Sequence, residues 1–161
     1  MPKSVMTHQF SQVPRAEIPR SSFDRSHGLK TTFDSGLLVP IYWDEALPGD
    51  TFNLRMTAFS RMATPIHPVM DNLFMESFFF AVPVRLIYNQ WQQLHGEQPN
   101  PGDSINFLVP EQTSTSVNGE GSLADYFGLP LTDGVKYSQL HFRAYNLCWN
   151  EFFRDENLQS R

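Results

Sequence analysis

Apolar and polar side chains alternate most clearly between residues 50 and 60. Within "TFNLRMTAF", apolar side chains occupy every second position: Phe52, Leu54, Met56 and Ala58. The residues between them are polar, so one face of this segment suits a core and the other suits water. The period of two predicts a half-buried β-strand over 50–60.

A nearly continuous apolar run, "GLLVPIYWD", comes before that segment and predicts another strand over 36–44. Pro40 has no amide hydrogen to donate, which places this strand at a sheet edge or at a bulge. The piece "LPGD" joins the two predicted strands. It puts Pro48 and Gly49 at the central positions of a type II turn.

The stretch "MDNLFMESFFFAVPVRLIYNQW" changes its period at Pro83. Before this proline, bulky apolar residues occupy both faces of a predicted strand over 70–82, so both faces need covering. After it, apolar residues fall on one helical stripe, at Val84, Ile87, Tyr88, Trp91 and Leu94. This spacing predicts a helix over 84–94 that starts at Pro83 and stops at Gly96.

Two more helical signals follow a loop rich in Gly, Pro, Asn, Ser and Thr over 97–121. "SLAD", from Ser122 to Asp125, has the pattern of a capping box and predicts a single helical turn. Residues 139–154 carry apolar side chains at helical spacing on two faces. A helix that is apolar on two faces is buried, so we expect this one to lie against other elements.

The first 29 residues predict an extended arm. The pieces "VPRA" and "IPRS" place two prolines five residues apart, which prevents regular helix there. Residues 1–30 hold five basic and two acidic residues, a net charge of +3, whereas residues 31–161 hold seven basic and fifteen acidic residues, a net charge of −8. This contrast suits either a solvated, flexible leader or an arm that meets a polyanion.

Composition supports one globular domain, with 40% hydrophobic, 14% aromatic and 18% charged residues in a chain of 161. The single cysteine, Cys148, excludes an intrachain disulfide. No apolar run approaches the roughly 18 residues that span a bilayer, and the N-terminus has no signal-peptide core.

The sequence contains no catalytic or metal-binding motif that we recognise. The nearest carboxylate pairs are Asp44 with Glu45 and Asp71 with Glu76. At odd spacing on strands the members of each pair point to opposite faces, so they cannot act together as acid and base. Cys148 on a predicted helix suits a small core residue better than a nucleophile. We therefore expect no enzyme activity, no metal and no cofactor.

The predicted elements do not cover all the aromatic side chains. A β-sandwich needs two sheets about 10 Å apart, each with an inner face, and this chain supplies roughly half of one sheet. We therefore expect residues 30–161 to be the incomplete N-terminal part of a larger domain, and residues 1–29 to be its arm.

Four stretches, in family order, resemble the major capsid protein of the Microviridae, small single-stranded DNA bacteriophages, and the gokushovirus branch in particular. They are "FSQVPRAEIPRSSFDRSHGLKTTFDSGLLVPI", "DEALPGDTFNLRMTAFSRMATPI", "MDNLFMESFFFAVPVRLIYNQWQ" and "FRAYNLCWNEFFRDENLQ". The resemblance implies a mainly β fold, part of a viral jelly roll: an antiparallel β-sandwich with helices in the connections between strands. Helical connections and neighbouring subunits would cover the outer face of residues 70–82.

The resemblance also implies a function. The chain would belong to a structural subunit of a small icosahedral capsid that encloses single-stranded DNA, found in the virion and, during assembly, in the host cytoplasm. Its partners would be further copies of itself and other virion proteins. The alternative is a jelly-roll binding module, lectin-like or cupin-like, without catalysis. The sequence shows neither the loop carboxylates expected of a lectin nor the clustered His and Glu ligands expected of a cupin.

The basic residues of the arm are the candidate contact residues: Arg15, Arg20, Arg25 and Lys30. The three arginines recur every five residues and would stand roughly 15 Å apart in an extended chain. Two interpretations stay open. The arm contacts phosphates of the packaged DNA, or it pairs with carboxylates on a neighbouring subunit.

Overall fold

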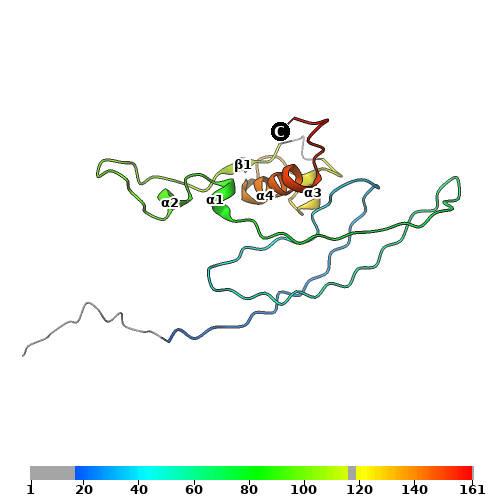
Figure 1. The fold of residues 1–161 in the computed structure, drawn as a ribbon, viewed down its shortest axis with the longest axis horizontal. Helices are drawn as coiled ribbons and strands as arrows, with labels where there is room; N and C mark the ends of the chain where they lie inside the picture. The colour runs from blue at the N-terminus through cyan, green and yellow to red at the C-terminus, as the bar shows by residue number, and fades with distance from the viewer. Residues whose placement is uncertain (1–16, 116–118, 161) are drawn as a thin grey trace, which may run out of the picture. The chain divides into compact units, whose positions relative to one another are not determined.

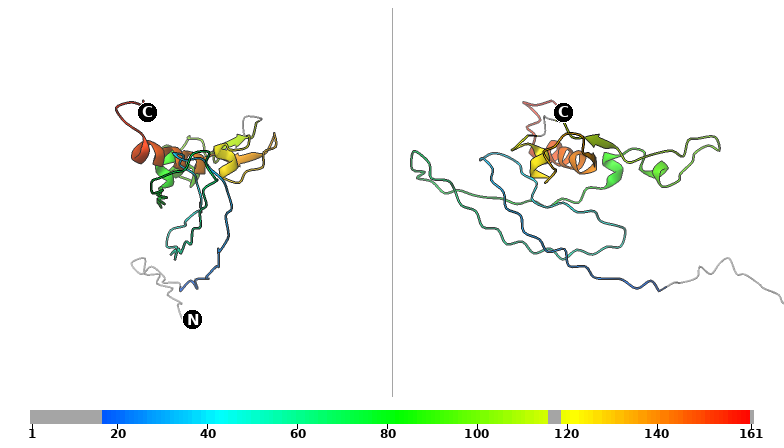
Figure 2. Two further views of the ribbon diagram at one scale, coloured as in Figure 1. Left: turned by 90° about the vertical axis from the view of Figure 1, so that its right-hand side faces the viewer. Right: turned by 180° about the vertical axis from the view of Figure 1, so that it is seen from behind.

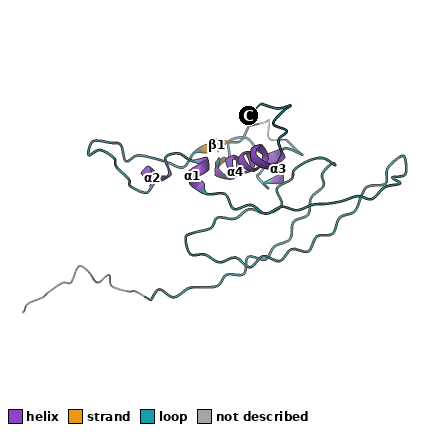
Figure 3. Ribbon diagram, in the orientation of Figure 1, coloured by secondary structure: helices purple, strands orange, loops and turns teal. Residues whose placement is uncertain are grey.

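The computed structural model describes residues 17–115 and 119–160. The chain divides into two compact units, Met1–Lys30 and Thr31–Arg161. Within the described residues, all helices and strands belong to the second unit (Figures 1 and 3). They are α1 (Val84–Ile87), α2 (Trp91–Leu94), β1 (Glu111–Thr113), α3 (Leu123–Tyr126), β2 (Lys136–Ser138), α4 (Leu140–Cys148) and the π-helical turn η1 (Trp149–Phe153).

The helix predicted over 139–154 is confirmed, and it changes type near its end. α4 continues directly into η1, whose five-residue turn is closed by the Arg154 N–H donating to the Trp149 carbonyl at 2.9 Å. A π turn widens the helix and changes the directions of the side chains that follow. Here it lets both Phe152 and Phe153 contact Phe80, at ring separations of 4.9 and 6.1 Å.

The helix predicted over 84–94 forms at its two ends only. Pro83 caps α1 and Gly96 terminates α2 as predicted, but residues 88–90 separate the two helices. The continuous helix is therefore a wrong prediction. Tyr88 leaves the helical conformation (φ −141°, ψ 103°), buries its ring to 6% exposure, and donates its hydroxyl to the Leu108 carbonyl at 2.9 Å.

Gly96 and Gly128 end α2 and α3 in the same way. Both adopt positive φ, +94° and +72°, which glycine tolerates without a Cβ clash. Their N–H groups donate to carbonyls three residues back, and the following residues donate five residues back, which is the Schellman pattern. The predicted turn at Ser122 is also confirmed, since its hydroxyl accepts from the Asp125 N–H at 3.3 Å.

The core of the second unit is a cluster of aromatic rings around α3 and α4. Phe127 is 8% exposed and packs against Phe142 at 4.7 Å, Trp43 at 5.3 Å and Tyr145 at 6.2 Å, in tilted or edge-on arrangements. In both further views of Figure 2, α3 and α4 lie beside each other. The cluster joins Trp43 of the extended chain to Phe127, which lies 84 positions later in the sequence.

One small antiparallel sheet is present in the described residues. β1 pairs with β2 so that Gln112 lies opposite Tyr137. Ser114 follows β1 directly and is 3% exposed. Its hydroxyl donates to the Thr132 carbonyl at 2.5 Å and accepts from the Val135 N–H at 2.9 Å, so it binds the loop that leads into β2. A buried hydroxyl with both roles satisfied fixes the loop before β2.

The strands predicted over 36–44, 50–60 and 70–82 are not present as strands. In the described chain these ranges run without a backbone ladder, and Figure 1 shows them as long extended loops. The alternation of side chains reports burial on one face, whereas a strand also requires a neighbouring backbone that accepts and donates hydrogen bonds. Within residues 17–115 and 119–160, no neighbouring segment forms such a ladder with these ranges. The described residues form few helices and one small, open sheet, so a jelly roll stays a prediction.

We predict that Ser114→Ala destabilises the loop before β2 by about 1 to 3 kcal/mol, because the Thr132 carbonyl and the Val135 N–H both lose a partly buried hydrogen bond. Hydrogen exchange at the Val135 amide should become faster. Ser104→Ala is the control, since Ser104 is exposed and its hydroxyl accepts only from the nearby Asn106 N–H. Equal exchange in both variants would contradict the role of Ser114.

Candidate assembly interface

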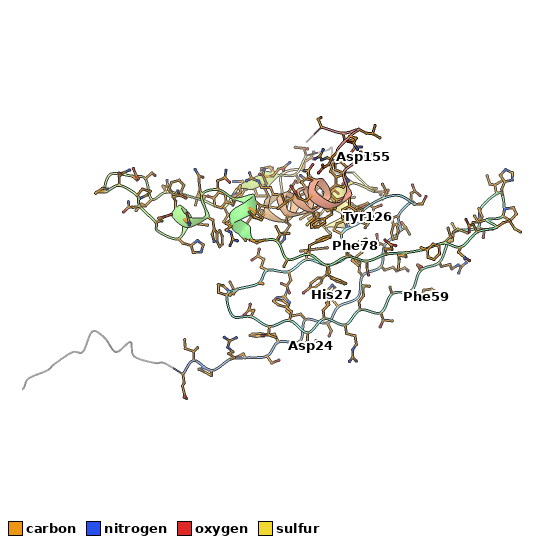
Figure 4. All side chains as sticks on the ribbon, viewed as in Figure 1. Asp24, His27, Phe59, Phe78, Tyr126 and Asp155 are labelled. Carbon is orange, nitrogen blue, oxygen red and sulfur yellow. The ribbon has the colours of Figure 1, made fainter. Side chains whose placement is uncertain are left out.

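Large apolar side chains are exposed along most of the extended chain from 52 to 80. Phe59 is 92% exposed, Ile66 96%, Met70 93% and Phe74 86%. Figure 4 shows Phe59 on the extended chain, away from the helices. The alternating residues Phe52, Leu54 and Met56 are about half exposed. Contiguous apolar surface of this kind marks an interaction site in a folded protein.

The π turn covers part of this surface. Phe78 lies beneath the end of the long helix (Figure 4), with its ring 5.3 Å from the ring of Phe153 in an edge-on arrangement. Phe80 lies 4.9 Å from Phe152. Phe78 and Phe80 are 51% and 40% exposed, compared with 86% for Phe74 on the same predicted face. The π turn therefore covers this face in part at residues 78 and 80 and leaves residue 74 open.

A groove opens between the extended chain and η1. We call it the Glu76 groove; its volume is about 350 Å³ and it is lined by Gly36, Leu37, Leu38, Glu76, Phe78, Trp149 and Phe153. Three aromatic rings and two leucines line it together with polar atoms. The exposed carboxylate of Glu76 is its one charged group, and this carboxylate has no hydrogen bond or ion pair within the described part of the chain.

The hydroxyl of Tyr145 holds one wall of the groove. It donates from α4 to the Leu38 carbonyl at 2.8 Å, across 107 positions of sequence. Burial raises the pKa of this phenol above its ordinary value, because a phenolate there would lose its water. Tyr145 was not predicted as a site residue, and its place on an apolar face of a predicted helix is the one signal for it. Glu76 was considered only as the partner of Asp71 in a possible acid–base pair.

The predicted contact residues of the arm lie in a different unit. Arg20, Arg25 and Lys30 are exposed on a segment without helix or strand, and Arg15 lies outside the described residues. Between them, the Asp24 carboxylate accepts from the hydroxyl and the N–H of Ser26, and these bonds lower the pKa of Asp24. Contact of these basic residues with DNA or with a neighbouring subunit stays a prediction.

Asp44, Glu45 and Cys148, also considered for chemistry, do not line the groove. The Tyr42 hydroxyl donates to Asp44, and Glu45 lies 3.5 Å from the ring of His141. Cys148 is half-buried on α4, and burial raises the pKa of its thiol. Residues 17–115 and 119–160 hold no group of three or more His, Cys, Asp or Glu side chains placed to bind a metal ion. None of their helices has the length and apolar character to cross a bilayer.

Residues 11–161 match the family model described as "Capsid protein (F protein)" of phages. The chain belongs to this capsid protein family. Three curated relatives are each named capsid protein VP1. The one from Chlamydia phage 1 is 48% identical over 97% of this chain, that from Bdellovibrio phage phiMH2K 44% over 94%, and that from Spiroplasma virus 4 35% over 95%.

The resemblance to the capsid proteins of the Microviridae is thereby confirmed. The chain spans 28% or 29% of the length of these relatives. The open groove and the exposed apolar chain therefore belong to a capsid-family segment that is much shorter than the relatives it matches.

We predict that residues 1–161 of this capsid-family chain aggregate when expressed alone, because the apolar side chains from 52 to 80 have no cover. Changing Phe52, Leu54 and Met56 together to Ser should raise the soluble fraction in a centrifugation assay. The control changes Asn53 and Thr57, which occupy polar positions of the same alternating segment, to Ser. A soluble wild-type monomer with a sharp unfolding transition would contradict the prediction.

We predict that Tyr145→Phe lowers the free energy of unfolding of the unassembled complete polypeptide by about 1 kcal/mol, through loss of the bond to Leu38. The pKa of Tyr145 is higher in the folded state, so its contribution is intact below the unfolded pKa of about 10 and is lost as the pH rises through the folded value.

Denaturant titrations at pH 8 and at rising alkaline pH measure both effects. The variant should lose stability less steeply than the wild type above pH about 10. Tyr137→Phe is the control, since the Tyr137 hydroxyl has no hydrogen-bond partner in the described residues. Identical alkaline profiles for the wild type and Tyr145→Phe would rule out this role.

Proposed function

We propose that this chain is part of the structural subunit of a small icosahedral bacteriophage shell that encloses single-stranded DNA. The observation that carries the proposal is the family match over residues 11–161, with relatives named as capsid proteins. The exposed apolar chain from 52 to 80 supports it, because a shell subunit has neighbours on several sides that bury such surface. The role is structural and involves no catalysis.

The fold proposed for the complete subunit is a jelly roll. The ranges 36–44, 50–60 and 70–82 carry the side-chain pattern of strands and become strands when other backbone segments pair with them. In the relatives, most of the polypeptide lies outside the matched region, which covers 28% of the length of the VP1 protein of Chlamydia phage 1. Such additional chain supplies the second sheet.

The proposed partners are further copies of the subunit and other virion proteins. The proposed location is the virion, and the host cytoplasm during assembly. In this proposal the arm contributes to contacts between copies, because a segment of net charge +3 without a core of its own suits the acidic surface of a neighbour.

The test is assembly of the complete natural polypeptide that contains this chain. Closed particles of uniform size are expected by negative-stain electron microscopy and sedimentation. A soluble monomer that forms no particles would contradict the proposal. Binding of that monomer to a glycan array would instead support a lectin-like module.

We predict that deleting residues 1–29 from the complete polypeptide impairs assembly more than it impairs folding of the subunit, because the described part of the arm contains no helix, strand or buried residue. Particle yield should fall while the circular dichroism spectrum and the unfolding midpoint of the free subunit stay close to the wild-type values. A matched deletion of residues 98–104 from the exposed loop after α2 is the control. Normal particle yield from the arm deletion would contradict the prediction.

A further inference from the structure

Asp133 and Gly134 form a turn in the loop that leads into β2. No other aspartate of this chain is followed by glycine. Asp133 is exposed, and its carboxylate has no hydrogen bond or ion pair among the described residues. We propose that Asp133 is a site of spontaneous isomerisation to isoaspartate, and that Ser114 holds this reaction in check while the loop is folded.

The reaction needs only these two residues and water. The backbone nitrogen of Gly134 attacks the side-chain carboxyl carbon of Asp133 and forms a C–N bond. The amide proton and the carboxyl hydroxyl leave as water, and a succinimide ring remains. Another water molecule then opens the ring at one of its two carbonyls. Opening at the original main-chain carbonyl leaves the main chain running through the side-chain carbons, which is isoaspartate, with no net change in mass.

Gly134 suits this attack because nothing crowds its nitrogen. It has no side chain, and a Cβ placed there would meet no atom of a more distant residue within 4 Å. Its φ of +87° is a conformation that glycine adopts without a steric penalty. The other aspartates precede residues whose Cβ restricts the backbone and hinders ring closure. Asp133 is therefore the aspartate whose sequence context favours the reaction most.

Ser114 binds the loop on both sides of Asp133. Its carbonyl accepts from the Gly134 N–H at 3.0 Å, and its own N–H donates to the Val135 carbonyl at 2.8 Å. Its hydroxyl donates to the Thr132 carbonyl and accepts from the Val135 N–H. The nitrogen that must attack is thus the one whose proton is bound to Ser114. Because the attack requires these bonds to open, the folded loop reacts only during the fraction of time that it is open.

The product does not fit the same set of bonds. Isoaspartate places one additional carbon in the main chain at residue 133, which changes the spacing between Thr132 and Val135. Both of these residues bond to the one hydroxyl of Ser114, which is 3% exposed, so a lost bond there leaves a buried group without its partner. The modified loop therefore stays open. Isomerisation separates chains by the time that they have spent with this loop unfolded.

Ageing of the complete natural polypeptide, as the free subunit at neutral pH, tests the inference. The aged samples are digested with a protease that cleaves before aspartate but not before isoaspartate. An uncut bond between Thr132 and Asp133, in a peptide of unchanged mass, reports the product by mass spectrometry. Asp103 is the internal control, because it precedes Ser104 and its carboxylate accepts from the Asn100 N–H at 3.0 Å.

The folded and unfolded polypeptides should differ in rate at residue 133. In denaturant the wild type should accumulate isoaspartate at least about tenfold faster than in the folded state, because the bonds to Ser114 are absent. Folded Ser114→Ala keeps the backbone bonds and loses those of the hydroxyl, so it should react at least about fivefold faster than the folded wild type. Ser104→Ala is the matched control and should react like the wild type, since that exposed hydroxyl accepts only from the nearby Asn106 N–H.

Three results would overturn the inference. Equal accumulation at residues 133 and 103 in denaturant would show that the Asp133–Gly134 pair is not a modification site. Equal rates for the folded and the unfolded wild type would show that the folded loop restrains nothing. This comparison needs no variant, so it decides the restraint even where Ser114→Ala fails to fold. Equal rates for folded wild type and folded Ser114→Ala would remove the restraint from the Ser114 hydroxyl.

Discussion

Tyrosine hydroxyls hold the extended part of this chain to its short helices. Tyr145 donates to the Leu38 carbonyl at 2.8 Å, Tyr88 to the Leu108 carbonyl at 2.9 Å and Tyr126 to the Thr32 carbonyl at 3.3 Å. Backbone carbonyls outside a sheet otherwise bond to water, and each tyrosine supplies a donor together with a ring that packs beside the segment. The positions of Leu38 and Leu108 in the second unit follow from these bonds.

Aromatic contacts extend the same arrangement to residues 78–80. Phe78 and Phe80 meet Phe152 and Phe153 because the helix changes from α4 to a π turn at Trp149. The result is a groove lined by aromatic rings and a single carboxylate.

Local signals in the sequence were sufficient where one or two residues determine the backbone. Gly96 ended a helix and Ser122 capped one, because glycine permits positive φ and a serine oxygen satisfies a free N–H. The turn of "LPGD" formed with Gly49 at φ +87° for the same reason. The helix at 139–154 was predictable because its apolar positions cover two faces.

Signals that depend on distant residues were not sufficient. The break at Tyr88 follows from a hydrogen bond to Leu108, twenty positions away, and no helical stripe contains that information. The ranges 50–60 and 70–82 have the side-chain period of strands without the backbone partners that make strands. The Glu76 groove joins residues 36–38, 76–78 and 149–153, so no single window of the sequence shows it.

The order of these elements along the chain has a consequence for synthesis. Phe78 contacts Phe153, so 75 further residues must be made before the first ring meets its partner. At about 5–20 residues per second, this interval is about 4–15 s, far longer than the roughly 100 μs or less in which a chain of about 100 residues collapses. During that time the apolar chain from 52 to 80 has emerged without its helical cover. This apolar segment is therefore open to association with other chains for seconds before its own helical cover is available.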